Sequence, residues 1–192
     1  MNEEDVDSIL TYWFTNKTDP TNQWNATIWF YGGVEAQTHI MQNFTCLIEP
    51  MAESLRQGHS SAPYESSSWL TTKSKIATII LLDQFPRLIY HGTSEMYKYD
   101  DLASSLAKEV LQDQRVPFTT LPWTHRLFVL LCLSHMEDVL SVNEAAIGMS
   151  TLAAQLHEDA ETYAPVLVTR IRRIFKNTES HLTIIKRYVS CK

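Results

Sequence analysis

Helical spacing of the apolar residues is the feature that most limits what this chain can fold into. In residues 100–114 (DDLASSLAKEVLQDQ), apolar side chains recur at positions i, i+3, i+4, i+7 and i+8, as on one face of a helix. These side chains are Ala103, Leu106, Ala107, Val110 and Leu111. Asp100 stands in front of them as a candidate N-cap residue. Strand-like alternation is sustained nowhere, so we predict an all-α protein.

A second amphipathic helix is predicted in residues 69–85 (WLTTKSKIATIILLDQF). One side of it carries Ile76, Ile79, Ile80 and Asp83, so the apolar stripe becomes acidic at its end. Pro86 disfavours helical geometry at Phe85. We therefore expect the DQFPR stretch to be a helix C-terminus followed by a turn.

Helices are expected throughout the C-terminal half. The segment after Pro122 (PWTHRLFVLLCLSHMEDVL) is nearly continuously apolar in its middle, as a central buried helix should be. The next helix is expected to begin at Asn143 as its cap. Two further helices are predicted in the segments YAPVLVTRIRRIFK and ESHLTIIKRYV.

The N-terminal part is predicted to hold a short helix in VDSILTYWF and a longer one from about Glu35 to Arg56, interrupted or kinked at Pro50. Between them lies a loop rich in aromatic residues, which we interpret as core or loop-anchoring side chains. The polar stretch QGHSSAPYESSS is expected to be a loop within one domain. The chain of 192 residues is thus predicted to be a single compact bundle, residues 1–192, of seven or eight antiparallel helices.

Charge and cysteine usage exclude several classes of protein. A net charge of −6 argues against nucleic acid as the main ligand, and the basic stretch TRIRRIFK is better explained as a solvated helix face. The three cysteines show no paired spacing, so reduced thiols are expected. The acidic N-terminus lacks the order of a signal peptide, and no apolar run approaches the ~20 residues of a membrane helix. We therefore expect a cytoplasmic protein with no membrane partner.

Two groups of polar residues are candidates for a site. Asp83, Gln84 and Arg87 come where an apolar helix ends. Arg126, His135 and Asp138 are expected on one long helix, with His135 and Asp138 on the same face at i, i+3. Arg126 lies about two and a half turns before His135, so we expect it near that face as well.

Buried charges in this region would need one another, because an unpaired charge in a core is very costly. We expect one of the acids to pair with one of the arginines; the acids are Asp83, Glu137 and Asp138, and the arginines are Arg87 and Arg126.

Two interpretations of these residues stay open. In the functional one, a pocket between two helices uses His135 and Asp83 for proton transfer. The residues that would bind an anionic or carbonyl-bearing ligand there are Gln84, Arg87, Arg126, Glu137 and Asp138. In the structural one, the same residues form a network that fixes helix packing and satisfies carbonyl groups at a helix end.

Other chemistries find little support. Glu137 is expected to point away from the His135 and Asp138 face, and no second histidine lies one turn away, so no metal is expected. Cys132 stands in the apolar stretch LLCLS, where a thiol is expected to be inert. The chain has no GxSxG motif and no phosphate-binding glycine loop, so no cofactor is expected either.

Several stretches in one order resemble the family catalogued as domain of unknown function 924, or DUF924. They are YWF, the WF of Trp29 and Phe30, LLDQFPR, the GT of Gly92 and Thr93, and YDDLASSLAKE. Further along, Arg126, His135, Glu137 and Asp138 match the ends of the family pattern R-x-F-x-Y-x-P-x-x-H-S-E-D. The resemblance covers most of the chain and implies an all-helical, TPR-like arrangement.

The chain also departs from that family pattern. Leu88 stands for the family's Asn after DQFPR, and His91 stands for an Arg before its GT. Leu130, Cys132 and Ser134 replace Tyr, Pro and Glu. The family usually continues into an RFGRFPHRN-like segment where this chain reads KRYVSCK, so we expect a pocket lid, if relatives use that segment as one, to be lost or remodelled.

Two classes of function are consistent with these observations. The first is a binding or interaction module with a polar cleft near Asp83, Arg87, Arg126 and His135, whose partner is a small anionic ligand or a protein. The second is a cofactor-independent enzyme of proton-transfer or hydrolase type, with His135 as acid or base and Arg87 and Arg126 as the anion clamp.

Overall fold

The computed structural model describes residues 1–15, 25, 28–29, 32–58, 72–158 and 165–190. Within these residues the chain is helical and contains no strand, which confirms the all-α prediction. The described part also contains no helix that is long and apolar enough to cross a membrane. Most of the predicted N-terminal loop and nearly all of the QGHSSAPYESSS stretch lie outside the described residues.

The described helices fall into an N-terminal, a central and a C-terminal group along the chain. The N-terminal elements are α1 (Glu3–Phe14), α3 (Gly33–Asn43) and α4 (Thr45–Arg56). The central elements are α5 (Thr72–Ile79), a π-helical turn η1 (Ile80–Gln84), α6 (Phe85–Ile89), a 3-10 turn η2 (Ser94–Tyr97) and α7 (Asp100–Gln112). The C-terminal elements are a 3-10 turn η3 (Phe118–Thr120), α8 (Trp123–Ser134), α9 (Val139–Glu158) and α10 (Pro165–Ser190).

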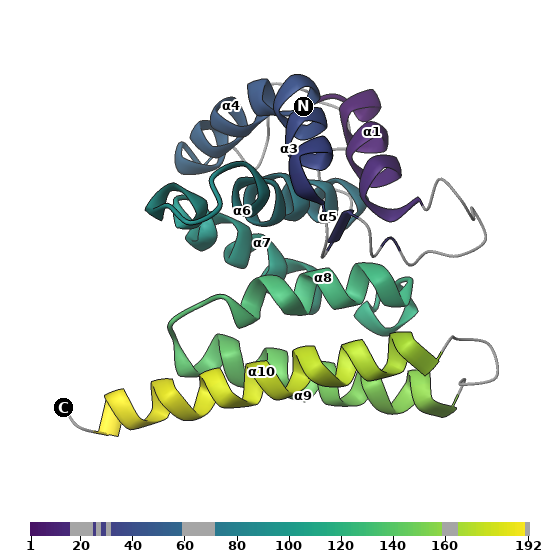
Figure 1. The fold of residues 1–192 in the computed structure, drawn as a ribbon, viewed down its shortest axis with the longest axis vertical. Coiled ribbons are helices and arrows are strands. Elements are labelled where there is room, and N and C mark those ends of the chain that lie inside the picture. Colours follow the sequence, from purple (N-terminus) through teal and green to yellow (C-terminus); the bar gives the residue numbers. More distant parts are fainter. Residues whose placement is uncertain (16–24, 26–27, 30–31, 59–71, 159–164, 191–192) are drawn as a thin grey trace.

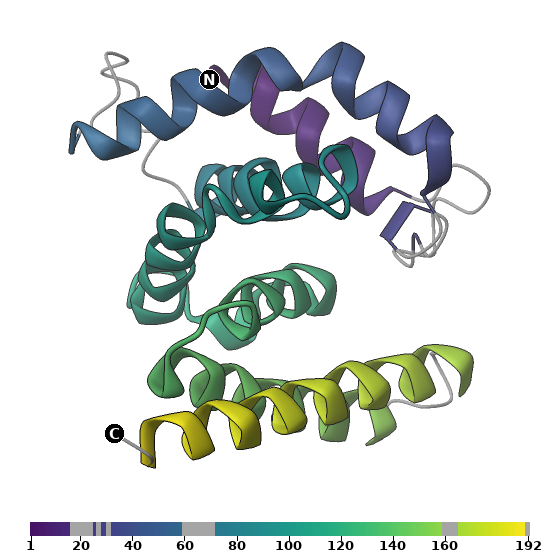
Figure 2. The same cartoon turned by 60° about the vertical axis from the view of Figure 1, so that its left-hand side comes forward.

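The helices stack in layers from the N-terminal to the C-terminal end of the molecule (Figure 1). Helices α1, α3 and α4 cover the α5–α6 segment, and α8 lies between that central part and the hairpin of α9 and α10 (Figures 1 and 2). A continuous cluster of buried apolar side chains runs through these layers from α1 to α9. Its centre is the α5–η1 segment, because Ile79, Ile80, Leu81 and Leu82 have no exposed surface at all.

Aromatic residues near the N-terminus pack in this core, as the sequence indicated. Trp13, Phe14 and Trp29 are buried, and the rings of Trp13 and Trp29 both pack edge-on or tilted against Phe128 of α8. The indole Nε1 of Trp29 donates to the carbonyl oxygen of Trp13 at 2.8 Å. Trp24, Phe30 and Tyr31 lie outside the described residues.

The predicted interruption of the helix at Pro50 is wrong. Pro50 lies inside α4 and is exposed, so its ring meets solvent rather than the core. The break instead occurs at Phe44, between α3 and α4. Phe44 is buried and stacks on Phe85 of α6 at a centroid distance of 5.1 Å, so burial of this ring sets where the chain turns.

Two predicted boundaries in the C-terminal half also differ. Helix α9 begins at Val139 rather than after Asn143, so Asn143 lies inside the helix and is not its cap. The two predicted last helices are one continuous helix, α10, which packs along α9. Two basic residues of α10, Arg173 and Lys176, are exposed, in agreement with a solvated face at those positions.

Candidate functional site

The α5–α6 segment passes through Pro86 without ending, contrary to the predicted helix stop at DQFPR. The N–H of Phe85 donates to the carbonyl oxygen of Ile80, five residues back, which defines a π-helical turn. Proline has no N–H and its ring needs room beside the preceding turn, and a widened turn supplies that room. The helix then continues to Ile89. Asp83 and Gln84 therefore lie inside a buried helical turn, and Arg87 lies one turn further on.

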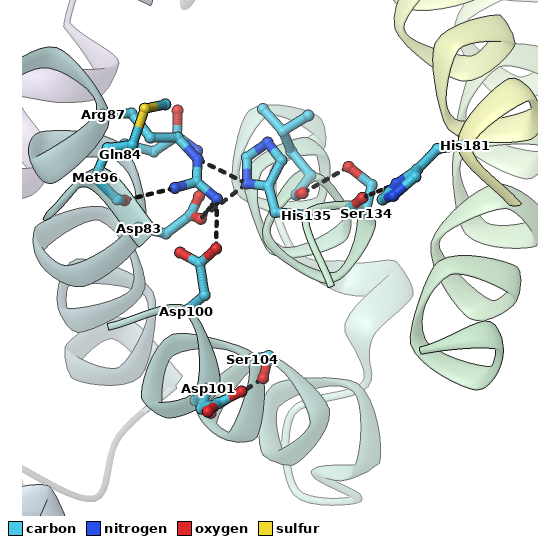
Figure 3. Close-up of polar contacts among 11 residues, drawn as sticks. Asp83, Gln84, Arg87, Met96, Asp100, Asp101, Ser104, Ser134, His135 and His181 are labelled. Atoms are coloured by element: carbon cyan, nitrogen blue, oxygen red, sulfur yellow. Dashed lines mark hydrogen bonds and ion pairs between the residues drawn. The ribbon is translucent and has the colours of Figure 1, made fainter. Parts of the chain in front are cut away.

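Asp83 is the centre of the polar cluster (Figure 3) and has no exposed surface. Its Oδ1 lies 2.8 Å from Nδ1 of His135 and 3.3 Å from Nη2 of Arg87, and its Oδ2 accepts a hydrogen bond from the amide of Gln84. Burial acts to raise the pKa of this carboxyl, but His135, Arg87 and Gln84 outweigh burial and hold the pKa below its ordinary value. Asp83 is therefore a paired, ionised carboxylate in the core.

Arg87 joins three other segments through its guanidinium group. Nε lies 3.1 Å from Nδ1 of His135, Nη1 donates to the carbonyl oxygen of Met96 at 2.9 Å, and Nη2 donates to Oδ2 of Asp100 at 2.9 Å. The ring of Tyr97 packs against this group, 5.5 Å from its central carbon. Burial would lower the pKa of Arg87, and the neighbouring Asp83 and Asp100 carboxylates raise it. All three nitrogen atoms of Arg87 are thus engaged within the protein.

Asp100 belongs to this cluster, although we predicted it only as a helix cap. Tyr99 is the N-cap of α7, and Asp100 is the first residue of the helix. Its Oδ2 binds Arg87, and its Oδ1 is buried without a hydrogen-bond partner in the described part of the chain. Burial raises the pKa of Asp100, and the nearby Asp83 adds to that rise. In the sequence, the only signal at Asp100 was its position at the start of a predicted helix. Ordinary N-cap residues give the same signal.

His135 follows the last residue of α8, Ser134, and is the C-cap of that helix. Its side chain is bound to Asp83 and is 24% exposed, so part of it meets solvent. The Ser134 carbonyl oxygen is 2.9 Å from Nδ1 of His181 on α10 (Figure 3). Sequence reasoning missed His181, because nothing near it in the chain points to the end of α8.

Glu137 and Asp138 do not share a helix face with His135, because α8 ends at Ser134 and both acids lie in the connection to α9. Glu137 is exposed. Asp138 caps α9, since its Oδ1 accepts the backbone N–H of Ser141 at 2.8 Å. Burial would raise the pKa of Asp138, and the bonds from Ser141 lower it. The expected pairing of an acid with an arginine is made instead by Asp83 and Arg87, 3.3 Å apart.

Arg126 lies away from this cluster. Arg126 and His135 are about two and a half helical turns apart, so on one helix their side chains would point about 180° away from each other. The expectation that they share a face is therefore wrong. Nη1 of Arg126 donates to Oε1 of Gln155 on α9 at 2.7 Å. Of the predicted site residues, the structure thus brings together Asp83, Gln84, Arg87 and His135.

Comparison with known proteins places the chain in a family. A family model described as "Bacterial protein of unknown function (DUF924)" matches residues 9–190. The chain belongs to the DUF924 family. No curated protein sequence matches it.

The DUF924 chain is also similar to a solved structure, described as a protein of unknown function, ATU0120, from Agrobacterium tumefaciens. The two share 22% sequence identity with a TM-score of 0.60, and the match covers 95% of this chain and 83% of the other. At that identity the likeness shows a common fold and nothing about the site.

Among the residues that the structure describes, no three His, Cys, Asp or Glu side chains are placed to hold a metal ion together. Cys132 is 1% exposed, and burial, together with the nearby Asp83 and Asp100, raises the pKa of its thiol well above the ordinary value. This agrees with the inert thiol that the apolar stretch around Cys132 indicated.

Proposed function

We propose that this DUF924 chain is a single helical ligand-binding module, TPR-like in the pairing of its helices, whose ligand contacts the imidazole of His135. The observation that carries the proposal is the contact of 2.8 Å between fully buried Asp83 and Nδ1 of a ring that is 24% exposed. A buried carboxylate that holds one ring nitrogen orients the ring and directs the other nitrogen, Nε2, to a ligand.

The residues that hold His135 in place are themselves fixed by contacts with neighbouring helices. Gln84 and Arg87 hold Asp83, and Arg87 is anchored by Asp100 at the start of α7 and by the Met96 carbonyl of η2. Functional groups that are fixed by such contacts lose little entropy when they bind. This supports a binding role for His135, with Asp83 and Gln84 as positioning residues.

The anion clamp expected from two arginines is not part of the proposal. Arg126 binds Gln155 on α9, and each nitrogen of Arg87 already has a protein partner. Glu137 and Asp138 lie in the connection before α9, where Asp138 caps that helix. The proposed site therefore consists of His135 and the residues that hold it.

A second candidate is cofactor-independent proton transfer on a small molecule at the same histidine. The Asp83–His135 contact favours it, because a carboxylate on Nδ1 fixes the ring and stabilises the imidazolium that forms when Nε2 takes a proton. The two candidates use the same residues and differ in whether the bound molecule is changed.

The test compares His135→Gln with His91→Gln, a change at an exposed histidine. Purified protein is incubated with a small-metabolite extract, and retained and altered compounds are identified by mass spectrometry. We expect the parent and His91→Gln to retain the same compound and His135→Gln to lose it while keeping the parent melting temperature within a few degrees. Retention by His135→Gln at the parent level would refute the binding role, and consumption of a compound by the parent alone would select the enzyme.

A further inference from the structure

The last helix, α10, carries an excess of positive charge in an acidic protein. It contains six basic residues and one acidic residue, which gives a net charge of +5, whereas the whole chain has a net charge of −6. The rest of the chain therefore carries −11. Helix α10 also forms the end of the stack of helices, where it packs mainly on α9 (Figures 1 and 2). The excess of positive charge thus lies at one end of the stack.

Helix α10 turns one side toward α9 and another toward solvent. Its inner side is marked by Thr178, which is 4% exposed and whose hydroxyl oxygen lies 3.4 Å from the sulfur of Met149 on α9. Exposed side chains recur on another side at positions i, i+4, i+7 and i+11, and one more exposed side chain lies beside them. These five residues, which we call the outer face, are Arg173, Asn177, Ser180 and Ile184, with Lys176 beside them.

The two cations of the outer face differ from exposed cations elsewhere in the protein. Arg56, Lys73 and Lys98 are exposed, and each forms an ion pair with a carboxylate of this chain. Arg173 and Lys176 are also exposed, but neither forms an ion pair with any acid among the residues that the structure describes. Their charge is therefore available to a partner, whereas the charge of a paired cation is already opposed by its neighbour.

The chemistry of the outer face favours a protein partner over nucleic acid or lipid. Proteins that hold single-stranded nucleic acid stack its bases on aromatic side chains, and none of the five residues is aromatic. A helix that lies on a membrane inserts a broad apolar side, and the outer face has one apolar residue, Ile184, which is 52% exposed. Carboxylates together with an apolar side chain, as in an acidic segment of a protein, match this combination of cations and Ile184.

We propose that the outer face of α10 docks an acidic, amphipathic segment of another protein. Carboxylates of that segment pair with Arg173 and Lys176, and an apolar side chain covers Ile184. Arg173 and Ile184 are eleven residues apart, about 16 Å along the helix axis, so a partner helix of about three turns spans them. At physiological ionic strength charges are screened over about 8 Å, less than the distance between the N-terminal helices and α10, so the acids of those helices oppose the approach only weakly. None of the five residues belongs to the cluster around His135, so this proposal is independent of the proposed ligand.

The probe is a fluorescently labelled peptide of about 18 residues, or about five helical turns, that forms a helix with Glu on one side and Leu beside it. A second peptide has Gln in place of every Glu. Fluorescence anisotropy measures the affinity at about 0.1 M salt, where charges are screened over about 10 Å. We expect the acidic peptide to bind the parent protein at least about tenfold more tightly than the Gln peptide. Equal binding of the two peptides would overturn the pairing of charges without any variant having to fold.

The position of the surface is tested by reversing its two cations. Arg173→Glu combined with Lys176→Glu should weaken binding of the acidic peptide by about tenfold, because two attractions become repulsions. The matched control combines Arg56→Glu with Lys73→Glu, which changes the net charge by the same amount at exposed residues elsewhere and should bind like the parent. An equal loss in the two double variants would show that binding follows net charge alone, and would overturn the proposal. Melting temperatures establish that both variants are folded.

The class of partner is tested with two further probes under the same conditions. They are an oligouridylate of the same charge as the acidic peptide and vesicles of phosphatidylserine and phosphatidylcholine. We expect both to bind more weakly than the acidic peptide. If either binds more tightly and loses that binding in the variant with Arg173→Glu and Lys176→Glu, the protein class is wrong. If the parent protein binds none of the probes, the outer face is not a docking surface for anions.

Discussion

Asp83 and His135 are 52 positions apart in the chain, yet Oδ1 of the first lies 2.8 Å from Nδ1 of the second. Asp83 comes from the π-helical turn in the middle of the core, and His135 comes from the C-terminus of α8. The contact therefore ties the end of one helix to the middle of another, and Arg87 extends it to η2 and α7. Both the stability of the molecule and its proposed ligand depend on this junction.

Replacement of Arg87 by methionine is expected to destabilise the protein strongly. Arg87→Met keeps an unbranched, flexible side chain but leaves the carboxylates of Asp83 and Asp100 without their cation in a buried setting. Breaking a buried pair in this way costs about 3 to 5 kcal/mol in the free energy of unfolding, measured by urea titration.

Arg56→Met is the matched control for that experiment. Arg56 also forms an ion pair, with Glu49 at 3.0 Å, but the two side chains are 38% and 54% exposed, so its loss should leave the urea midpoint near that of the parent. Equal midpoints for the two variants would contradict a buried network at Asp83.

Stability should fall between about pH 6.5 and pH 4 because of His125. Burial lowers the pKa of His125 from 6.5 to about 4, so the folded protein binds fewer protons than the unfolded chain in this range. His125 contributes its full share of stability at a pH above its pKa in the unfolded chain. That share is lost as the pH falls through its pKa in the folded protein. This shift in pKa corresponds to about 3 kcal/mol in the free energy of unfolding.

His125→Phe should flatten that pH dependence. The imidazole stacks on Phe14 at a centroid distance of 4.1 Å and 13° between planes, so a phenyl ring can occupy the same place without a titrating group. The measurement is the melting temperature of parent and variant at intervals from pH 7.5 to about pH 4. An unchanged slope in His125→Phe would show that another group causes the loss.

The two described cysteines should differ widely in reactivity. Cys46 is exposed, whereas Cys132 is buried, and this burial together with the charges of Asp83 and Asp100 raises the pKa of its thiol and leaves little thiolate. In a Cys191→Ser background, native protein should take up one equivalent of a thiol reagent rapidly, and Cys46→Ser should abolish that phase. Rapid labelling of Cys132 in the native state would contradict its place in the core.

His181 should hold α10 against the end of α8. Nδ1 of His181 lies 2.9 Å from the carbonyl oxygen of Ser134, which is one of the carbonyl groups that a helix C-terminus leaves unsatisfied. His181→Phe removes this bond, with a loss of about 1 kcal/mol, and hydrogen exchange of the amides around residue 181 should become faster. Ser180→Ala, whose hydroxyl bonds only within α10, is the control and should exchange like the parent. Unchanged exchange in His181→Phe would show that apolar packing alone holds this part of α10.

Local patterns in the sequence were sufficient for the fold class and for most of the helices. The stripe that runs from Ala103 to Val110 lies in α7 with Ala103, Ala107 and Val110 wholly buried, as its spacing required. Periodicity is a local property, because residues three and four apart share a helix face wherever the helix lies. Asp83 and Arg87 were candidates because they come where the apolar segment was expected to end, and they form an ion pair.

Only the tertiary structure decided where the helices end and which residues form the polar cluster. Burial of Phe44 sets the break between α3 and α4, and the side-chain cap at Asp138 starts α9 before Asn143. Asp100 joins the junction because α7 packs beside α8, and His181 reaches the Ser134 carbonyl from α10, whereas Arg126 binds Gln155 on α9. The sequence by itself determined which stretches are helical. It also showed that charged residues follow directly after an apolar stretch. Which of those charges meet depends on the packing of helices far apart in the chain, and no local spacing encodes it.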